Sequence, residues 1–308
     1  MAKTLVILNP IAGVGRAEKA WAQIESALRN GGLEFDLVRS EAPCHAITLA
    51  EKAKRDGYDT LIGVGGDGIV HEIMNGMMRA SNGQPTGTFG IIPVGSGNDF
   101  AKMIPLAPRD WQTAVQKILA GNTRWFDMGK VTVDADADCS DPHVRYFDNS
   151  FDVGFGAQVS RYSHIPILTG TAMYLVAILR TMVNYFIPRL KITLADGTVI
   201  EKKSTMTVAA IGRCFGGGFW IAPEAQVDDG LLDVLVAVEL GRVGILQLIP
   251  KIMQGKHIGD PRVAFYRSPN LVIESPDPLA IECDGEVPWT DAHRIQIEVL
   301  PKRLQVIC

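Results

Sequence analysis

The sequence lacks the cysteine pairs that bind metals or crosslink small secreted domains. Its five cysteines, an odd number without a CxxC pair, are Cys44, Cys139, Cys214, Cys283 and Cys308. This scatter argues against both a disulfide framework and a zinc cluster. Because unpaired thiols fit a reducing compartment, we expect a cytoplasmic protein.

Long uninterrupted apolar runs and a strong excess of one charge are also missing. The apolar stretch at Thr4 to Leu8 is too short for a signal peptide. The only long tract, Ile165 to Ile187, contains Pro166 and Arg180, so we interpret it as a buried or interfacial helix rather than a membrane span. The net charge of −4 provides no bulk basic field, so we do not expect nucleic acid as a partner.

The residues that are present suit a globular protein of about two domains, with 308 residues, 47% hydrophobic and 21% charged. The first third of the chain alternates between short apolar runs, typical of strands, and segments with helical periodicity. This alternation predicts strands at 5–8, 35–38, 60–64 and 89–93, and helices at 20–28, 46–55, 69–79 and 110–120. Strands separated by such helices indicate βαβ units and a largely parallel sheet.

Beyond Asp127 the sequence predicts a β-rich region. Asp-Gly turns occur at 196–197 and 284–285, and one helix is predicted at 243–253. The acidic segment from Asp134 to Asp138 is interpreted as a solvated loop. The candidate strands are 130–133, 190–194, 205–211, 231–238, 270–274, 279–283 and 295–300.

The segment from Gly63 to Gly68, Gly-Val-Gly-Gly-Asp-Gly, lies where a predicted strand meets a predicted helix. Glycines at such a junction allow backbone N–H groups and the helix N-terminus to face an anion, most often phosphate. The carboxylate of Asp67 would repel phosphate unless a divalent cation or a proton-transfer role offsets its charge. On this motif alone, a turn in which Asp67 caps the helix is equally compatible.

Two more glycine-rich turns, Asn9 to Gly13 and Gly95 to Asp99, also follow predicted strands. In open α/β sheets the carboxyl edge of the strands is where ligands bind, so three turns there strengthen the prediction of a phosphate site. No GK[ST] follows any of them, and Gly13-Val-Gly15 lacks the third glycine of the dinucleotide fingerprint. The sequence therefore disfavours a Walker-type nucleotide-binding loop and a Rossmann-type dehydrogenase.

These motifs resemble the diacylglycerol kinase catalytic-domain superfamily, specifically its soluble bacterial lipid kinases, with sphingosine and ceramide kinases as distant relatives. The resemblance covers nearly the whole chain. Its motifs are Asn9-Pro10 with Gly13, Gly65 to Gly68 with Glu72 and Asn75-Gly76, Pro93 to Ala101, Gly154 to Ala157, Ala222-Pro223, Asp229 to Asp233, and Asp284 to Glu286.

The resemblance implies an α/β domain related to phosphofructokinases and NAD kinases at 1–127, and a carboxy-terminal β-sandwich at 128–301 that binds the lipid. ATP and the active site would lie in the cleft between them, and residues 302–308 would return to the first domain. Carried over by motif, the nucleotide contacts are Asn9, Pro10, Ile11, Ala12, Gly13, Ser40, Gly66, Asp67, Gly68, Ile69, Val70, His71, Glu72 and Ser96.

The resemblance also implies two metal roles and a base. Asp67 and Asp99 would organise the catalytic Mg²⁺. The base would be Asp284 or Glu286, which the sequence does not distinguish. A structural Mg²⁺ would be held by Gln226, Asp229 and Leu231.

Two positions depart from the family pattern of Gly-Asp-Gly-Thr followed by Asn, since this chain has Ile69 and His71. We interpret His71 as a phosphate contact or as a helix-surface residue without a role.

The resemblance implies an ATP- and Mg²⁺-dependent kinase of a membrane lipid such as diacylglycerol, peripheral at the membrane; homodimer formation is left open. The alternatives are a kinase of a soluble metabolite, as in NAD kinases, and a nucleotide-binding regulatory protein without turnover.

Overall fold

The computed structural model describes residues 3–107, 109–133, 143–162, 171–183 and 185–308. The chain forms two compact units, one of Met1–Met128 with Pro301–Cys308 and the other of Gly129–Leu300. The segment Asp134 to Asp138, predicted as a solvated loop, lies outside the described residues, as does the first part of the apolar tract that begins at Ile165.

The first unit is built on a parallel sheet in the order β4-β3-β1-β2. Strands β1, β3 and β4 are buried along almost their whole length, as expected for parallel strands covered on both faces. All four predicted strands of this region are present. Their bounds are β1 (Thr4–Leu8), β2 (Asp36–Arg39), β3 (Thr60–Gly65) and β4 (Thr88–Pro93).

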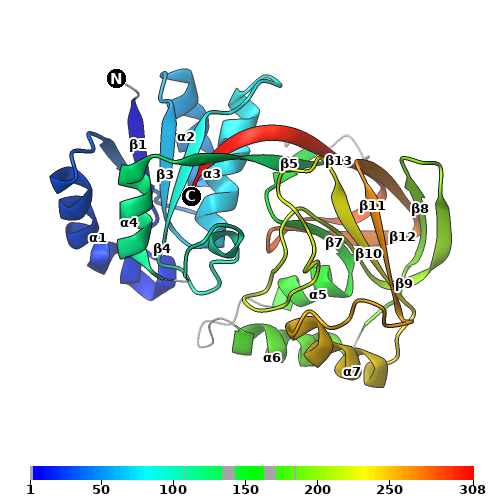
Figure 1. Cartoon of the computed structure of the whole chain (residues 1–308). Helices are drawn as coiled ribbons and strands as arrows, with labels where there is room; N and C mark the ends of the chain where they lie inside the picture. The colour runs from blue at the N-terminus through cyan, green and yellow to red at the C-terminus, as the bar shows by residue number, and fades with distance from the viewer. Residues whose placement is uncertain (1–2, 108, 134–142, 163–170, 184) are drawn as a thin grey trace. The chain divides into compact units, whose positions relative to one another are not determined.

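The helices of this unit follow the apolar periodicity of the sequence. Helix α1 (Ala12–Asn30) contacts α4 (Trp111–Ala120), and α2 (His45–Arg55) contacts α3 (Asp67–Ala80), as Figure 1 shows on the two sides of the sheet. A short 3₁₀ helix, η1 (Phe100–Met103), follows β4. Helix α4 begins where Asp110 accepts the Thr113 N–H at 3.0 Å and ends at Gly121, whose φ is +69°.

The carboxy-terminal residues complete the same sheet. The end of β13 (Glu286–Ile307) pairs in parallel with β4, Gln305 opposite Thr88 and Val306 opposite Phe89. The Lys302 N–H donates to Asp127 Oδ1 at 2.8 Å, which fixes the chain where it enters this unit.

The second unit is a set of antiparallel strands that includes the first part of β13. The Asp284–Gly285 turn joins β12 to β13 with φ values of +51° and +92°, as an Asp-Gly hairpin requires. The other strands are β5 (Thr123–Val133), β6 (Val144–Phe147), β7 (Ser150–Gly154), β8 (Arg189–Leu194), β9 (Val199–Ala210), β10 (Leu232–Val238), β11 (Val263–Ser268) and β12 (Asn270–Cys283).

Strand β12 differs from the sequence prediction of two strands, 270–274 and 279–283. It is one strand whose pairing with β13 shifts between Glu274 and Leu279, where Pro276 and Pro278 cannot donate to the ladder. Strands β6, β7 and β11 and helix α5 (Phe155–Tyr162) were not predicted.

Helices α5, α6 (Thr171–Thr181) and α7 (Arg242–Met253) lie together in this unit (Figure 1). Side chains of all three join one apolar core with β9 and β10. Helix α6 has a buried and an exposed side: Ala177 and Ile178 are buried, whereas Leu179 is 57% exposed. Among the described residues, no helix combines the length and apolarity needed to cross a bilayer.

The packing of β5 against β6 yields a stability prediction. Gly129 faces Phe147, and a Cβ at position 129 would lie 2.0 Å from Cζ of that buried ring. We therefore expect Gly129→Ala to lower the free energy of unfolding by about 1–3 kcal/mol through overpacking. Urea titration measures this effect. The control is Gly241→Ala, where an added Cβ meets nothing within 4 Å; equal midpoints for the two variants would contradict the packing argument.

Candidate functional site

The three glycine-rich turns of the first unit lie at one edge of its sheet. The Asn9 N–H donates to Val64 O at 3.0 Å, and the N–H groups of Val94 and Gly95 both donate to Gly65 O, at 2.8 and 3.1 Å. The turns after β1, β3 and β4 are thus hydrogen-bonded to neighbouring strand ends. A Cβ on Gly95 would lie 2.4 Å from the Cα of Gly66, so only glycine allows the last two turns to approach this closely.

The turn after β1 leads into a short left-handed run of backbone. Gly13, Val14 and Gly15 have φ values of +61°, +61° and +77°, and Val14 is a β-branched residue in a region that such residues rarely adopt. A Cβ on Gly13 would lie 2.2 Å from Val94 O. The Arg16 Nε donates to Gly13 O at 2.8 Å. This tight turn therefore places a guanidinium beside backbone suited to an anion.

Helix α3 starts at this edge and offers backbone donors. Its N-cap is Gly66, and among the described residues the N–H groups of Gly68 and Ile69 have no hydrogen-bond partner. Such free first-turn N–H groups bind phosphate readily. The side chains of Ile69 and Val70 are 2% and 1% exposed, so these two candidates can reach a nucleotide only through backbone atoms.

Two carboxylates come together where α3 begins. Burial, and then the charge of Asp99, raise the pKa of Asp67 to about 7, although the Phe100 N–H, 3.1 Å from Asp67 Oδ1, lowers it in part. Asp99 is 6% exposed and lies 2.5 Å from Lys102 Nζ. Like charges held this close favour a divalent cation, which prefers carboxylate oxygens. Asp67 and Asp99 therefore fit the catalytic metal that the sequence analysis expected.

Two candidates on α3 have different surroundings from those expected. The Glu72 carboxylate accepts the N–H groups of Cys44 at 3.0 Å and Ala46 at 2.9 Å, so it caps the N-terminus of α2 and is not free for a nucleotide. His71 is 4% exposed, with its Nε2 3.3 Å from Asn75 Nδ2, so the interpretation as a helix-surface residue is wrong. The periodicity of α3 places position 71 on a buried side of the helix.

The remaining nucleotide candidates follow strand ends at the same edge. Ser40 comes directly after β2 and is 8% exposed, with its N–H donating to Leu8 O at 2.9 Å. Ser96 lies in the turn after β4 and is half-buried. Of the predicted set, the residues from Asn9 to Gly13, Ser40, Gly66 to Gly68 and Ser96 share this edge.

The predicted base motif lies at the hairpin of β12 and β13 in the second unit. The Asp284 carboxylate accepts three backbone N–H groups, those of Asp148, Asn149 and Ser150, each at 3.0 Å. Glu286 is exposed, and its carboxylate has no hydrogen-bond partner among the described residues. The Asp284 carboxylate is thus held in place by hydrogen bonds, whereas the Glu286 carboxylate is exposed. A carboxylate at either position has the chemistry of a proton acceptor.

At the predicted structural metal site, the Asp229 carboxylate is ion-paired with an arginine side chain. Asp229 Oδ1 accepts the Leu231 N–H at 3.0 Å, and Oδ2 pairs with the guanidinium of Arg267. Arg267 lies opposite Asp233 in the ladder of β10 and β11. A divalent cation held by Gln226, Asp229 and Leu231 would therefore have to compete with the Arg267 guanidinium for Asp229. The Arg267 contact was not predicted because Arg267 lies 38 residues from Asp229 in the sequence.

Comparisons with known proteins agree with this organisation. Residues 3–131 match the model of the diacylglycerol kinase catalytic domain. Residues 149–308 match that of the YegS C-terminal NAD kinase beta sandwich-like domain.

The relatives are of similar length to this chain. A diacylglycerol kinase of Mycobacterium tuberculosis is 28% identical, covering 99% of this chain and 94% of the relative, and one of Bacillus subtilis is 24% identical, covering 93% and 90%. A crystal structure of a putative diacylglycerol kinase from Bacillus anthracis has a TM-score of 0.77 at 23% identity, covering 99% and 94%. Yeast NADH kinase complexed with NADH has a TM-score of 0.56 at 12% identity, covering 100% and 83%.

The fold and the matches define a kinase of the α/β plus β-sandwich class, which confirms the predicted fold class. The chain belongs to the diacylglycerol kinase catalytic-domain superfamily, in the branch with a YegS-type carboxy-terminal domain. Membership of a kinase family supports phosphotransferase activity, with ATP as the usual donor and a divalent metal as the usual cofactor.

The Arg267 contact yields a metal prediction. We expect Mg²⁺ to leave the melting temperature of the wild-type second unit unchanged but to raise that of Arg267→Met, because the variant leaves the charges of Asp229 and Asp233 for a metal to neutralise. Each kcal/mol of binding would add about 2–4 °C. Lys191→Met, which removes a surface ion pair with Glu274, is the control. Equal stabilisation of wild type and Arg267→Met by Mg²⁺ would contradict this prediction and support a structural metal site at Asp229.

Proposed function

We propose that this protein transfers the γ-phosphoryl group of ATP to a hydroxyl group of a membrane lipid, with diacylglycerol as the first candidate. The single observation that carries the lipid assignment is an apolar pocket in the second unit. Kinase-family membership supports the transfer reaction, and the pocket supports the class of acceptor.

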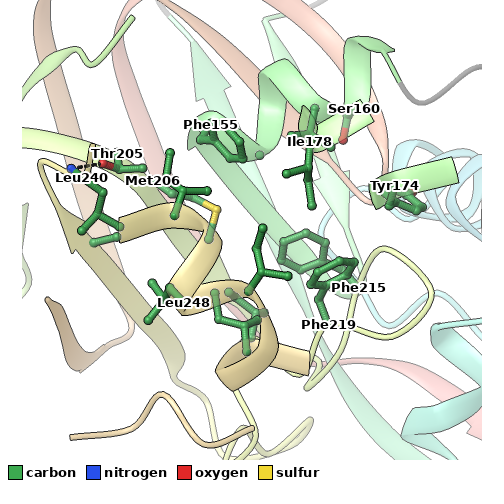
Figure 2. A pocket seen from close by; sticks show the side chains of 17 residues that line it. Phe155, Ser160, Tyr174, Ile178, Thr205, Met206, Phe215, Phe219, Leu240 and Leu248 are labelled. Carbon is green, nitrogen blue, oxygen red and sulfur yellow. Dashed lines mark hydrogen bonds between the residues drawn. The ribbon is translucent and has the colours of Figure 1, made fainter. Parts of the chain in front are cut away.

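The pocket lies between the three helices of the second unit and strands β9 and β10. Its cavity volume is about 80 Å³, and its walls are almost entirely apolar. Figure 2 shows Phe155 from α5, Ile178 from α6 and Leu248 from α7 around it, with Met206 from β9. An apolar cavity of this kind can take the end of an acyl chain and offers little to a charged metabolite.

Exposed apolar side chains on the same helices support contact with a membrane. Leu179 is 57% exposed and Val183 is 64% exposed on and after α6, and Val243 is 67% exposed on α7. Helices α6 and α7 both line the pocket. Exposed apolar side chains beside an apolar pocket are expected of a protein that takes its substrate from a bilayer surface, so peripheral membrane binding is part of the proposal.

The reaction divides into three roles. The turns after β1, β3 and β4 would bind the ATP phosphates through backbone N–H groups. Asp67 and Asp99 would hold Mg²⁺, which supplies charge neutralisation for the transferring phosphoryl group. The Asp284 to Glu286 motif would accept the hydroxyl proton as the lipid oxygen attacks.

Two rival functions follow from specific features. The fold likeness to yeast NADH kinase favours a soluble acceptor, and the absence of a hydroxyl at Ile69, whose side chain is buried, favours a protein that binds nucleotide without turnover. The apolar pocket supports the lipid acceptor over both, because neither rival needs it.

The deciding experiment is incubation with labelled ATP and Mg²⁺ in three arms, with a total lipid extract, with diacylglycerol vesicles and with NAD. We expect label in a lipid product. Label in NADP alone would identify a metabolite kinase. ATP binding without label in any arm would identify a protein without turnover.

Substitutions at the base motif should separate structural from chemical effects. Asp284→Asn should lower both the melting temperature and the transfer rate, because three backbone N–H groups lose an anionic acceptor. Glu286→Gln should leave the melting temperature unchanged. We expect at least one variant to lose about 10² or more in kcat with little change in ATP affinity. Near-wild-type kcat in both would remove the motif from proton transfer.

The pocket predicts a chain-length effect. Ile249 lines the pocket from α7, so Ile249→Trp should narrow it and raise KM for long-chain diacylglycerol more than for a short-chain analogue, with KM for ATP unchanged. The control is Val199→Trp, at an exposed β9 position away from the pocket. An equal rise in KM for both chain lengths would show that the acyl chain binds elsewhere.

A further inference from the structure

Two acidic side chains are buried opposite each other in the second unit. Asp152 on β7 and Glu282 on β12 are partners in the antiparallel ladder, and they are 0% and 2% exposed. Directly opposed residues on one face of a sheet have Cβ atoms about 4.5–5.5 Å apart. Acidic residues are almost never buried this completely unless they are paired.

Three of their four carboxyl oxygens have no hydrogen bond of normal geometry among the described residues. Glu282 Oε1 accepts the Gly285 N–H, whereas Glu282 Oε2 and both oxygens of Asp152 are buried without a partner of normal geometry. An unmade buried hydrogen bond is costly, so these oxygens call for a donor. A carboxylic acid proton is such a donor, and it would satisfy two of the three oxygens at once.

The electrostatics favour a retained proton. Burial raises the pKa of Asp152 to about 8, which the nearby N–H groups of Ala157 and Val153 offset only in part. Burial, and then the charge of Asp152, raise the pKa of Glu282 well above its usual range. Two carboxylates in one buried site cannot both ionise readily, and they titrate as a pair.

The surroundings of the pair are closed. A Cβ on Gly156 would lie 1.8 Å from Asp152 Oδ2, so α5 begins directly over this carboxyl. Three kinds of titratable group are coupled to the pair. Burial and then the charge of Asp152 raise the pKa of Tyr185. Burial and then the charges of Asp284 and Glu282 raise the pKa of Cys283, and Asp284 and Glu286 raise the pKa of Glu282.

The pair is connected to the candidate base motif. The Gly285 N–H that Glu282 accepts belongs to the turn that also carries Asp284, and Asp284 in turn holds the backbone of 148–150. Asp152 lies two residues after Ser150 on β7. The turn is therefore fixed from both strands that carry the pair.

We infer that Asp152 and Glu282 share one proton, and that the protonated pair positions the Asp284–Gly285 turn. The O–H of one carboxyl donates to a carboxylate oxygen of the other, which leaves Glu282 Oε1 free to accept from Gly285. Both are positioning residues, since neither is placed against substrate. The effect on catalysis, unlike the shared proton itself, rests on the proposed function.

The shared proton sets the direction of the pH dependence. Because the pKa of Asp152 is 3.8 in its ordinary state and about 8 in the fold, the folded chain binds more protons than the unfolded chain between these values. Stability contributed by this group therefore falls as pH rises through that range. Once the proton is lost to solvent, two carboxylates repel each other beneath the turn, and kcat should fall.

The test compares wild type with Asp152→Asn and Glu282→Gln, in which an amide replaces the titrating acid. Melting temperature is measured from pH 5 to pH 9, and kcat and KM for ATP are measured over the alkaline half of that range. We expect wild type to lose melting temperature and kcat as pH rises, with KM for ATP unchanged, and the amide variants to lose less of both. Glu274→Gln, at a half-buried position on β12 where the carboxylate pairs with Lys191, is the control and should follow wild type.

Each outcome decides one part of the inference. Melting profiles of both amide variants that run parallel to wild type would overturn the shared proton. Flattened melting profiles with an unchanged pH profile of kcat would overturn the positioning role. If one amide variant does not fold, the other decides. Absence of lipid phosphorylation by wild type would overturn the proposed function and the positioning role with it, whereas the melting profiles would still decide the shared proton.

Discussion

The close approach of the turns after β3 and β4 is the constraint on which the nucleotide-binding unit depends. Gly65 O receives two N–H groups from the chain after β4, and Gly66 packs against Gly95 at a distance that no side chain permits. This contact brings Asp67 and Asp99 into one largely buried environment, where burial and then the charge of Asp99 raise the pKa of Asp67. On the proposed function, this arrangement would bind both a cation and phosphate.

On the proposed function, the second unit has a different requirement, which is to bind a lipid chain and present a proton acceptor. Its helices α6 and α7 are apolar on two sides, since they supply both the pocket lining and exposed apolar residues. The carboxylate of Asp284 is held by three N–H groups, and the turn it occupies rests on the buried acids Asp152 and Glu282. Rigid support of this kind is what a catalytic group needs in order to act at one position.

Much of the fold and of the candidate site could be predicted from the sequence, because local rules govern it. Buried parallel strands are continuous apolar runs, glycine turns mark their ends, and Asp-Gly pairs mark hairpins. Strands β6, β7 and β11 were missed because each is only four to six residues long and has polar residues among apolar ones. The role of Glu72 as a cap, the Arg267 contact and the Asp152–Glu282 pair depend on residues distant in sequence, which spacing alone does not reveal.

The most direct test of the central claim is calorimetric binding of ATP to wild type and to Asp67→Asn, each with and without Mg²⁺. If Asp67 and Asp99 form the metal site, Mg²⁺ should strengthen ATP binding to wild type severalfold or more and have little effect on the variant, while both proteins melt at similar temperatures. Equal strengthening by Mg²⁺ in both proteins would contradict the account, because the carboxylate pair would then not be what holds the cation.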